Sequence, residues 1–342
     1  MEKFEVIIVG GGPGGLSCAR TLAEAGVRVM LLERKKTIGR KVCAGGITWD
    51  GLIQRVPENL IERSFTEQRI FSNWQEVCFR RKLPIIATIN REQLGRWMRD
   101  EAVKAGAEVR TGCNVREIQD QHVIVTDEQG KTFSLGWGQL VGADGSSSLV
   151  RRHLKIPSEK MGVGMNYQAR GSYEHMEWHL NTGLFRNGYG WVFPHRETVS
   201  IGAYRPQTGI PPVRFKKRLL RWAESKGFRL DEVPAQAELI NFDFRGFEFG
   251  KVWLVGDAAG LASGLTGEGI HPAIVSGETV ARKIIDPNDP AAEIARMVTK
   301  QQRHQRIVDL AAGSAANCTL LMEALVLLLR LRLINFQKHL SM

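Results

Sequence analysis

The sequence predicts an α/β fold, α+β overall, in which a Rossmann-like domain is interleaved with a β-sheet domain and followed by a helical tail. Three observations indicate this class. A strand, a glycine-rich turn and a helix open the 342-residue chain, as in a βαβ unit. Residues 155–249 alternate aromatic with polar residues between turn signals, which is typical of strands. Residues 291–342 have the residue spacing of helices instead.

The glycine turn that follows the first apolar run has the pattern GxGxxG. Gly10 permits a tight turn, Gly12 lets the backbone approach a pyrophosphate, and Gly15 lets the helix pack closely on the strand. The start of that helix, which includes Gly14, presents free N–H groups to phosphates. Glu33 closes the next apolar run, where its carboxylate can accept hydrogen bonds from ribose hydroxyls. The sequence therefore predicts a bound dinucleotide; the alternative is an ordinary βαβ turn without a ligand.

Two further segments read as a strand, a turn and the start of a helix. Residues 251–260 form a strand that ends in Gly-Asp, and residues 266–273 form a glycine-rich loop that enters a helix. The Asp257 carboxylate can bind a sugar-chain hydroxyl, and the positive end of the helix can stabilise negative charge on a reduced flavin ring. In residues 141–152, Asp144 and the serines after it can cap a helix.

Composition limits the classes of partner. The chain is 43% hydrophobic and carries a formal charge of +11, which fits a folded protein with affinity for anions. No long Lys/Arg run or aromatic–basic nucleic-acid motif occurs, so a nucleic-acid partner is not expected. The five cysteines form no CxxC pair, which argues against a metal site and suits a reducing compartment. The first strand starts near Met1, so a cytoplasmic location is expected.

The three motifs together, across residues 4–285, resemble the FAD-dependent oxidoreductases of the p-hydroxybenzoate hydroxylase fold superfamily. The resemblance implies that FAD is the cofactor and that Asp257 binds its ribityl-phosphate portion. It also implies that the backbone at Gly269 and Ile270 lies beside the isoalloxazine ring. Because the chain has one GxGxxG motif, the flavin is expected to receive electrons from a transient donor, either NAD(P)H or a ferredoxin-like protein.

Two more FAD contacts follow from the same resemblance. Residues 89–94 open a helix that is expected to end near Gly106, and they are similar to a segment with an FAD-contacting arginine, which Arg91 matches. Val115, on the next strand, matches a position that contacts the adenine side through its backbone. The alternative for Arg91 is a solvated charge in the first turn of a helix.

The segment Gly188–Pro194, followed by residues 200–203, narrows the family. It resembles the YxWxFP…GxG signature of geranylgeranyl reductases, with Tyr204 in place of the last glycine. Alternation along a strand sends Tyr189, Trp191 and Phe193 to one face, which suits a long apolar substrate. The resemblance implies that this strand lines a lipid cavity over the flavin. The alternative is that the three aromatics are core residues of a sheet.

The loop at residues 39–47 is similar to the Lys-x-Cys-Gly-Gly-Gly loop of the same reductases, with Ala44 in place of a glycine. The resemblance implies that Arg40, Cys43, Ala44 and Gly46 run along the flavin. A single cysteine in an apolar loop is more often an inert small hydrophobe, so no residue is assigned as catalytic.

The chain is thus predicted to alternate between an FAD-binding domain and a substrate-binding sheet domain before the helical tail. The predicted bounds are 1–68, 85–154 and 250–290 for the first, 69–84 and 155–249 for the second, and 291–342 for the tail. Residues 69–84 are expected to add one strand, and a helix is expected from about Val213 to Lys226. In the tail, charges interrupt the apolar run at 320–333, so a membrane span is not expected. The alternatives there are a helix at a membrane surface and a helix packed on the protein or a second subunit.

The resemblance to the geranylgeranyl reductase family implies an FAD-dependent oxidoreductase. The expected reaction reduces C=C bonds of an apolar, prenyl-type lipid chain by hydride transfer from reduced flavin. One alternative is a class A flavin monooxygenase acting on an aromatic or lipid substrate, which has the same scaffold. The other is a flavoprotein that binds a lipid or a partner without turnover. The expected location is cytoplasmic, with peripheral contact at the inner face of a membrane.

Overall fold

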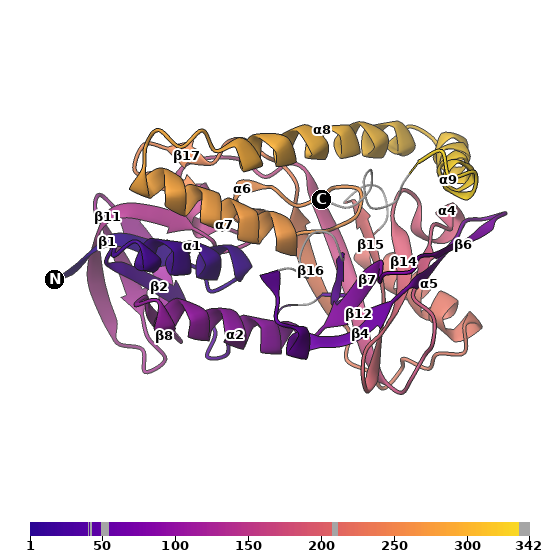
Figure 1. The fold of residues 1–342 in the computed structure, drawn as a ribbon, viewed down its shortest axis with the longest axis horizontal. Helices are drawn as coiled ribbons and strands as arrows, with labels where there is room; N and C mark the ends of the chain where they lie inside the picture. The colour runs from indigo at the N-terminus through magenta and orange to yellow at the C-terminus, as the bar shows by residue number, and fades with distance from the viewer. Residues whose placement is uncertain (40, 42, 49–54, 207–210, 335–342) are drawn as a thin grey trace.

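The computed structural model describes residues 1–39, 41, 43–48, 55–206 and 211–334, and two large sheets organise them (Figure 1). In the eight-stranded sheet the order is β17-β18-β11-β1-β2-β8, and the hairpin β9–β10 pairs with β11. The bounds of its strands are β1 (Glu2–Val9), β2 (Val29–Glu33), β8 (Glu108–Thr111), β9 (Asn114–Gln119), β10 (His122–Thr126), β11 (Thr132–Gly142), β17 (Glu248–Phe249) and β18 (Val252–Leu254).

Parallel pairing explains why the central strands are apolar on both faces. Strand β1 pairs in parallel with β2 and β11, and all of Val6–Val9 is buried, as expected where helices cover both faces of a sheet. The core on one face includes side chains of α1, α2 and α7. The core on the other face includes the hairpin β9–β10, α3 and α6. The bounds are α1 (Pro13–Glu24), α2 (Arg91–Lys104), α3 (Leu149–His153), α6 (Gly256–Ala259) and α7 (Ile270–Ile285).

Helices α1 and α7 lie unusually close to each other. A Cβ atom added at Gly277 of α7 would lie 2.1 Å from the carbonyl oxygen of Gly14, and one added at Gly15 would lie 2.1 Å from that of Gly10. Gly10 itself has φ of +110°, a conformation that favours glycine. The glycines therefore bring the two helices and the first strand within backbone contact distance.

The seven-stranded sheet has the order β16-β12-β15-β14-β13-β5-β6. Its strands are β5 (Glu67–Phe71), β6 (Glu76–Arg80), β12 (Met161–Arg170), β13 (Glu177–His179), β14 (Tyr189–Pro194), β15 (Thr198–Pro206) and β16 (Gln236–Asn241). Residues 69–84 were expected to add one strand, but this region forms the hairpin β5–β6 at the sheet edge. The expected helix after Val213 is α5 (Pro212–Ser225), and it covers one face of the sheet. The short helix α4 (Thr182–Phe185) lies before β14.

A three-stranded sheet of β3 (Gly46–Thr48), β7 (Ile86–Ile89) and β4 (Ile61–Phe65) lies between the large sheets (Figure 1). Phe65 and Ile86 from this sheet pack against the aromatic face of the seven-stranded sheet. The small sheet therefore connects the Rossmann-like part to the aromatic part. The predicted fold class is confirmed, while the predicted domain bounds stay a prediction.

The tail folds into two helices, α8 (Ala292–Ala312) and α9 (Ala315–Arg330). Helix α8 runs along the top of the molecule in Figure 1, from above α7 to the end where α9 lies. Helix α9 packs on the hairpin β5–β6 and on α4. Among the described helices, none is both long enough and apolar enough to cross a membrane.

The close approach of α1 and α7 gives a stability prediction. Replacing Gly277 by alanine forces a Cβ against the Gly14 carbonyl, and we expect the free energy of unfolding to fall by about 2 kcal/mol. The matched control is Gly313→Ala, because Gly313 is already α-helical and its added Cβ would lie 3.6 Å from the nearest atom. That variant should be unchanged or more stable by about 0.4–1 kcal/mol. Chemical denaturation measures both, and equal effects would contradict the close packing.

Candidate functional site

A cavity of about 810 Å³ begins at the carboxyl ends of β1 and β2 and reaches the aromatic face of the seven-stranded sheet. This is where open parallel sheets bind ligands. Nearly all of the residues singled out from the sequence line it. They are Gly10, Gly12, Gly14, Glu33, Cys43, Ala44, Gly46, Arg91, Val115, Tyr189, Trp191, Phe193, Asp257, Gly269 and Ile270. Gly15 is not among the lining residues and packs against Gly10 instead. Arg40 lies outside the described residues. The contacts of each residue with a cofactor stay predictions.

At one end of the cavity, backbone donors hold the Glu33 carboxylate in place. Its Oε2 accepts a hydrogen bond from Gly11 N at 2.6 Å, and its Oε1 accepts one from Lys35 N at 2.8 Å. The adjacent helix α1 begins at Gly12, and within the described residues no side chain caps this N-terminus. Uncapped N–H groups and the helix dipole favour a phosphate there.

Asp144 follows β11 at the same end of the cavity. One of its oxygens accepts hydrogen bonds from Leu149 N at 2.6 Å and Val150 N at 3.3 Å, and Ser148 Oγ accepts one from Arg151 N at 2.9 Å. The predicted helix capping by Asp144 and a serine is therefore confirmed. Burial raises the pKa of the Asp144 carboxyl despite these bonds, and its Oδ1 has no hydrogen-bond partner among the described residues.

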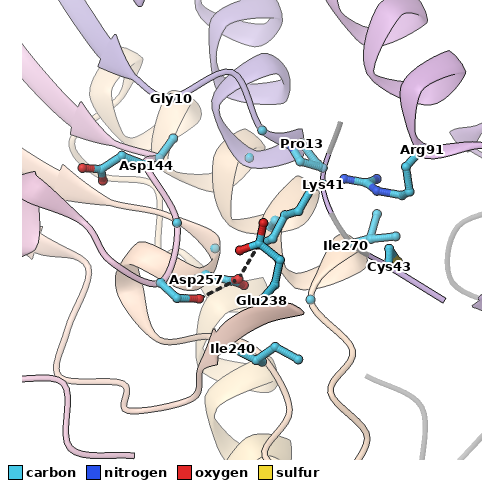
Figure 2. Close-up of a pocket in the computed structure, with 18 of the residues that line it drawn as sticks. Gly10, Pro13, Lys41, Cys43, Arg91, Asp144, Glu238, Ile240, Asp257 and Ile270 are labelled. Carbon is cyan, nitrogen blue, oxygen red and sulfur yellow. Dashed lines mark hydrogen bonds and ion pairs between the residues drawn. The ribbon is translucent and has the colours of Figure 1, made fainter. Parts of the chain in front are cut away.

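An ion pair crosses the middle of the cavity, with the Asp257 side chain 10% and the Lys41 side chain 38% exposed (Figure 2). Lys41 Nζ lies 2.8 Å from Asp257 Oδ2, and Ser146 Oγ donates to the same oxygen at 3.1 Å. Burial by itself would lower the pKa of Lys41, but the Asp257 carboxylate outweighs it and raises that pKa above its ordinary value. The sequence did not indicate that Lys41 and Ser146 would bind Asp257. Each nevertheless lies within a segment singled out above, residues 39–47 and 141–152.

Arg91 opens helix α2, whose N-cap Asn90 accepts hydrogen bonds from Glu92 N at 2.9 Å and Gln93 N at 3.1 Å. Figure 2 shows its guanidinium pointing into the pocket toward Lys41. The Nε and Nη1 atoms are buried and have no hydrogen-bond partner among the described residues. Burial lowers the pKa of the guanidinium. Unpaired buried charge is costly, so this arrangement indicates a ligand that accepts hydrogen bonds.

Aromatic side chains line the opposite end of the cavity. Tyr189, Trp191 and Phe193 of β14 form one buried cluster with Tyr204 of β15, and Trp178 of β13 packs on it. The polar atoms of Tyr189, Trp191 and Tyr204 are directed to the protein. Trp191 Nε1 donates to Ser200 Oγ at 3.0 Å, Tyr204 Oη donates to Gly264 O at 2.9 Å, and Tyr189 Oη donates to Thr266 O. The surfaces left to the cavity are therefore apolar.

The common face predicted for the three β14 aromatics agrees with this cluster. The sequence did not indicate that Trp178 belongs to this cluster. It lies there because the register of β13 and β14 pairs Trp178 directly with Trp191. Tyr204 was seen only as a departure from a motif. It is fully buried, and a Cβ added at Gly162 would lie 2.5 Å from its ring.

The loop that carries Cys43 is held from the sheet side. His195 Nε2 lies 3.0 Å from Ala44 O, and its Nδ1 contacts the Glu62 carboxylate. Gly45 has φ of +79°, and a Cβ there would lie 2.4 Å from the His195 ring. Cys43 Sγ accepts a hydrogen bond from Gly45 N at 3.3 Å. The loop is thus fixed by a His–Glu pair that the sequence alone did not reveal.

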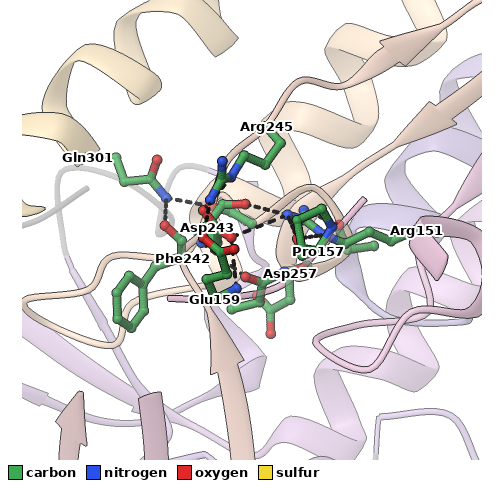
Figure 3. A network of polar contacts seen from close by, with 11 residues as sticks. Arg151, Pro157, Glu159, Phe242, Asp243, Arg245, Asp257 and Gln301 are labelled. Atoms are coloured by element: carbon green, nitrogen blue, oxygen red, sulfur yellow. Dashed lines mark hydrogen bonds and ion pairs between the residues drawn. The ribbon is translucent and has the colours of Figure 1, made fainter. Parts of the chain in front are cut away.

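A second polar network fixes the segment that carries Asp257 (Figure 3). Buried Arg151 donates to Ala258 O at 3.1 Å and to Asp243 O at 2.7 Å. Asn241 Nδ2 donates to the Asp257 carbonyl at 2.9 Å. Gln301 of α8 donates to Ala262 O at 2.9 Å. These bonds fix the backbone from Asp257 to Ala262.

Comparison with known proteins agrees with this geometry. Residues 3–312 match the family described as "FAD binding domain". Geranylgeranyl diphosphate reductase of Rhodobacter capsulatus is 31% identical over 303 residues, which cover 82% of this chain and 74% of that protein. A geranylgeranyl bacteriochlorophyll reductase-like protein from Thermoplasma acidophilum superposes with a TM-score of 0.75 at 20% identity, over 92% of each chain. A myxobacterial FAD-dependent halogenase superposes with a TM-score of 0.67 at 18% identity, over 90% of this chain and 80% of the other.

The cofactor of this chain is therefore FAD, and the residues of the cavity fit it. The uncapped start of α1 suits a pyrophosphate, Glu33 suits a ribose, and the unpaired Arg91 guanidinium lacks the acceptor that a cofactor would supply. Helix α7 also begins without a side-chain cap within the part of the chain described, at Gly269 on the cavity wall. Its positive end suits a flavin ring that gains negative charge on reduction.

The unpaired guanidinium gives the next prediction. Replacing Arg91 by methionine keeps most of its apolar stem but removes the donors, and a hydrogen bond to a charged group contributes about 1.5–3 kcal/mol. We expect the dissociation constant for FAD to rise roughly ten- to a hundredfold. Arg96→Met is the matched control, because Arg96 lies on the same helix, is exposed and pairs with Glu92. Fluorescence titration of the apoprotein with FAD measures both, and equal affinities would refute the assignment.

Proposed function

The chain belongs to the geranylgeranyl reductase family of FAD-dependent oxidoreductases, and on that premise we propose that it reduces C=C bonds of an isoprenoid or related lipid chain. The single observation that carries the proposal is the continuity of the cavity. One wall is formed by the residues assigned to FAD, and the other by Trp178, Tyr189, Trp191, Phe193 and Tyr204. A long apolar substrate lying on these aromatics would therefore reach the flavin.

The apolar character of this wall favours a lipid over a polar substrate. Because Tyr189, Trp191 and Tyr204 direct their polar atoms to protein partners, a hydroxylated ligand would find few partners here. A hydrocarbon chain gains about 25 cal/mol for each Å² of apolar surface that it buries. The removal of apolar surface from water thus favours a lipid substrate, and the aromatic faces hold its hydrocarbon chain in place.

The chain's own residues contribute binding, orientation and the exclusion of water. Bound FAD, once reduced, supplies the hydride that adds to one alkene carbon. The aromatic wall aligns the hydrocarbon chain of the substrate, and such alignment is the main means of catalysis for an unactivated alkene. The start of α7 supplies a fixed positive potential. Burial raises the pKa values of Tyr189 and Tyr204 far above the ordinary value, so both stay protonated and keep their hydrogen bonds to backbone carbonyls.

The second alkene carbon would take a proton from water or a nearby group, and an external donor would supply the electrons for each cycle. We propose NAD(P)H or a ferredoxin-like protein for this role. The chain carries one GxGxxG motif. This favours a donor that docks transiently and disfavours a second nucleotide site built into the chain.

An anaerobic reaction tests this function. The flavoprotein is reduced with dithionite, prenyl lipids such as geranylgeranyl diphosphate are added, and flavin absorbance and product mass are followed. We expect reoxidation without oxygen and a product with two more hydrogens for each bond reduced. A product formed only with oxygen, and carrying an oxygen atom, would instead identify a monooxygenase. Lipid binding with neither reaction would identify a binding protein.

A pair of tryptophan variants separates a substrate wall from an ordinary core. Trp191 and Trp222 are both 5% exposed and lie on opposite faces of the seven-stranded sheet, but only Trp191 lines the cavity. Both alanine variants should lose about 3–5 kcal/mol of stability. Only Trp191→Ala should also lower kcat/KM for prenyl substrates per flavin-loaded molecule, by roughly ten- to a hundredfold.

The readouts are the free energy of unfolding and the turnover per molecule of bound flavin. Normal turnover by folded Trp191→Ala, or an equal loss of turnover in Trp222→Ala, would show that the β14 aromatics are core residues and do not bind substrate.

A further inference from the structure

The outward side of α9 is an apolar surface. Leu320, Leu327 and Leu331 are 62%, 45% and 58% exposed. With Ala324 and Leu328 they recur at intervals of three or four residues, so they share one face of the helix. We call these five residues the leucine face. Most monomeric proteins do not keep such a contiguous patch in water, and one of this kind marks an interaction site.

This part of the chain is also almost free of charge. Between Asp309 and Arg330 the only charged residue is Glu323, and it is buried. Its carboxylate accepts hydrogen bonds from Ser72 Oγ at 2.7 Å and Asn73 N at 2.8 Å in the turn between β5 and β6. The buried charge of α9 is therefore used to attach that turn and does not meet the solvent.

The attached turn places a tryptophan beside the leucine face. Trp74 N also donates to Glu323, at 3.2 Å, while the Trp74 side chain is 72% exposed. Glu323 lies three residues from Leu320 and four from Leu327, which places the turn at the border of the leucine face. An exposed, amphipathic tryptophan next to leucines is typical of a protein surface that inserts into the interfacial region of a membrane.

Cationic side chains lie near this surface. Arg330 and Arg332 are exposed at the end of α9, and Arg186 is exposed after α4, close to Cys318 of α9. Helix α4 contacts both α9 and α5, and Figure 1 shows all three at one end of the molecule. The exposed cations of α5 are Arg214, Lys216, Lys217 and Arg221. The rim is therefore mainly positive, although Glu76, exposed two residues after Trp74, is acidic.

We propose that the leucine face and Trp74 dock on a membrane that contains anionic lipids. The apolar centre would enter the boundary of the acyl chains, and the cations of the rim would meet lipid phosphates. A second copy of this chain is the other candidate, and the test below includes it as an outcome. The overall charge of +11 has the sign that an anionic surface attracts.

The inner side of α9 connects this surface to the cavity. Val326 and Leu329 are buried in one cluster with Leu265, and Trp178 packs against that cluster. Trp178 also lines the cavity. One helix and one tryptophan thus lie between the docking surface and the apolar cavity. If the substrate is a lipid, as proposed above, docking would place its source next to its binding site; docking itself does not depend on the substrate.

Vesicle sedimentation tests the proposal with the FAD-loaded protein. Vesicles of phosphatidylcholine alone are compared with vesicles that also contain phosphatidylglycerol. We expect binding to the anionic vesicles, and the double variant Leu327→Glu/Leu331→Glu should weaken it at least tenfold. Leu83→Glu is the matched control, because Leu83 is 69% exposed but lies at the other end of β6, and its binding should not change. Flavin content and thermal stability show that each variant folds.

A charge variant separates the two parts of the surface. Arg330→Gln/Arg332→Gln should weaken binding to anionic vesicles roughly tenfold and reduce its dependence on salt. The proposal is overturned if the wild-type protein does not sediment with anionic vesicles, or if both double variants bind as it does. It is also overturned if the wild type is a dimer that Leu327→Glu/Leu331→Glu dissociates without any vesicle binding. Sedimentation is measured without turnover, so its failure is distinct from failure of the reductase assignment.

Discussion

The close approach of α1 and α7 is the constraint on which the rest of the site depends. Gly14 and Gly277 let the two helices meet at backbone distance. Their N-termini, at Gly12 and Gly269, therefore open into the same cavity, although they lie 257 positions apart in the sequence. Two positive helix ends thus face one cofactor, one at the position expected for its phosphates and the other at the position expected for its ring.

The same cavity is joined to the aromatic wall by hydrogen bonds. Tyr204 and Tyr189 donate to the carbonyls of Gly264 and Thr266, in the loop just before α7. Any shift of the aromatic sheet relative to that loop would leave two buried hydroxyls and two carbonyls unpaired, and each unpaired group costs about 1–3 kcal/mol. The distance between the two ends of the cavity is therefore fixed by the fold, and a fixed distance is what the proposed alignment of an alkene would require.

Local patterns in the sequence predicted the elements well, because each depends on residues near one another in the chain. The turn at Gly10, the helix cap at Asp144 and the common face of the β14 aromatics are all of this kind. Pairings between distant residues could not be predicted from one sequence. Lys41 meets Asp257 across 216 positions, and His195 meets Glu62 across 133. In each case either partner alone has many equally good alternatives.

Helix α9 shows the limit of sequence patterns most clearly. Its residues are apolar on nearly every side, and such a helix is expected either in a core or in contact with lipid. In the structure the two sides of the helix differ. Val326 and Leu329 pack in the core, while Leu327 and Leu331 are exposed to solvent. Glu323 decides which side faces inward, because a buried carboxylate needs donors and the β5–β6 turn supplies them. The position of one buried charge thus sets which leucines remain exposed.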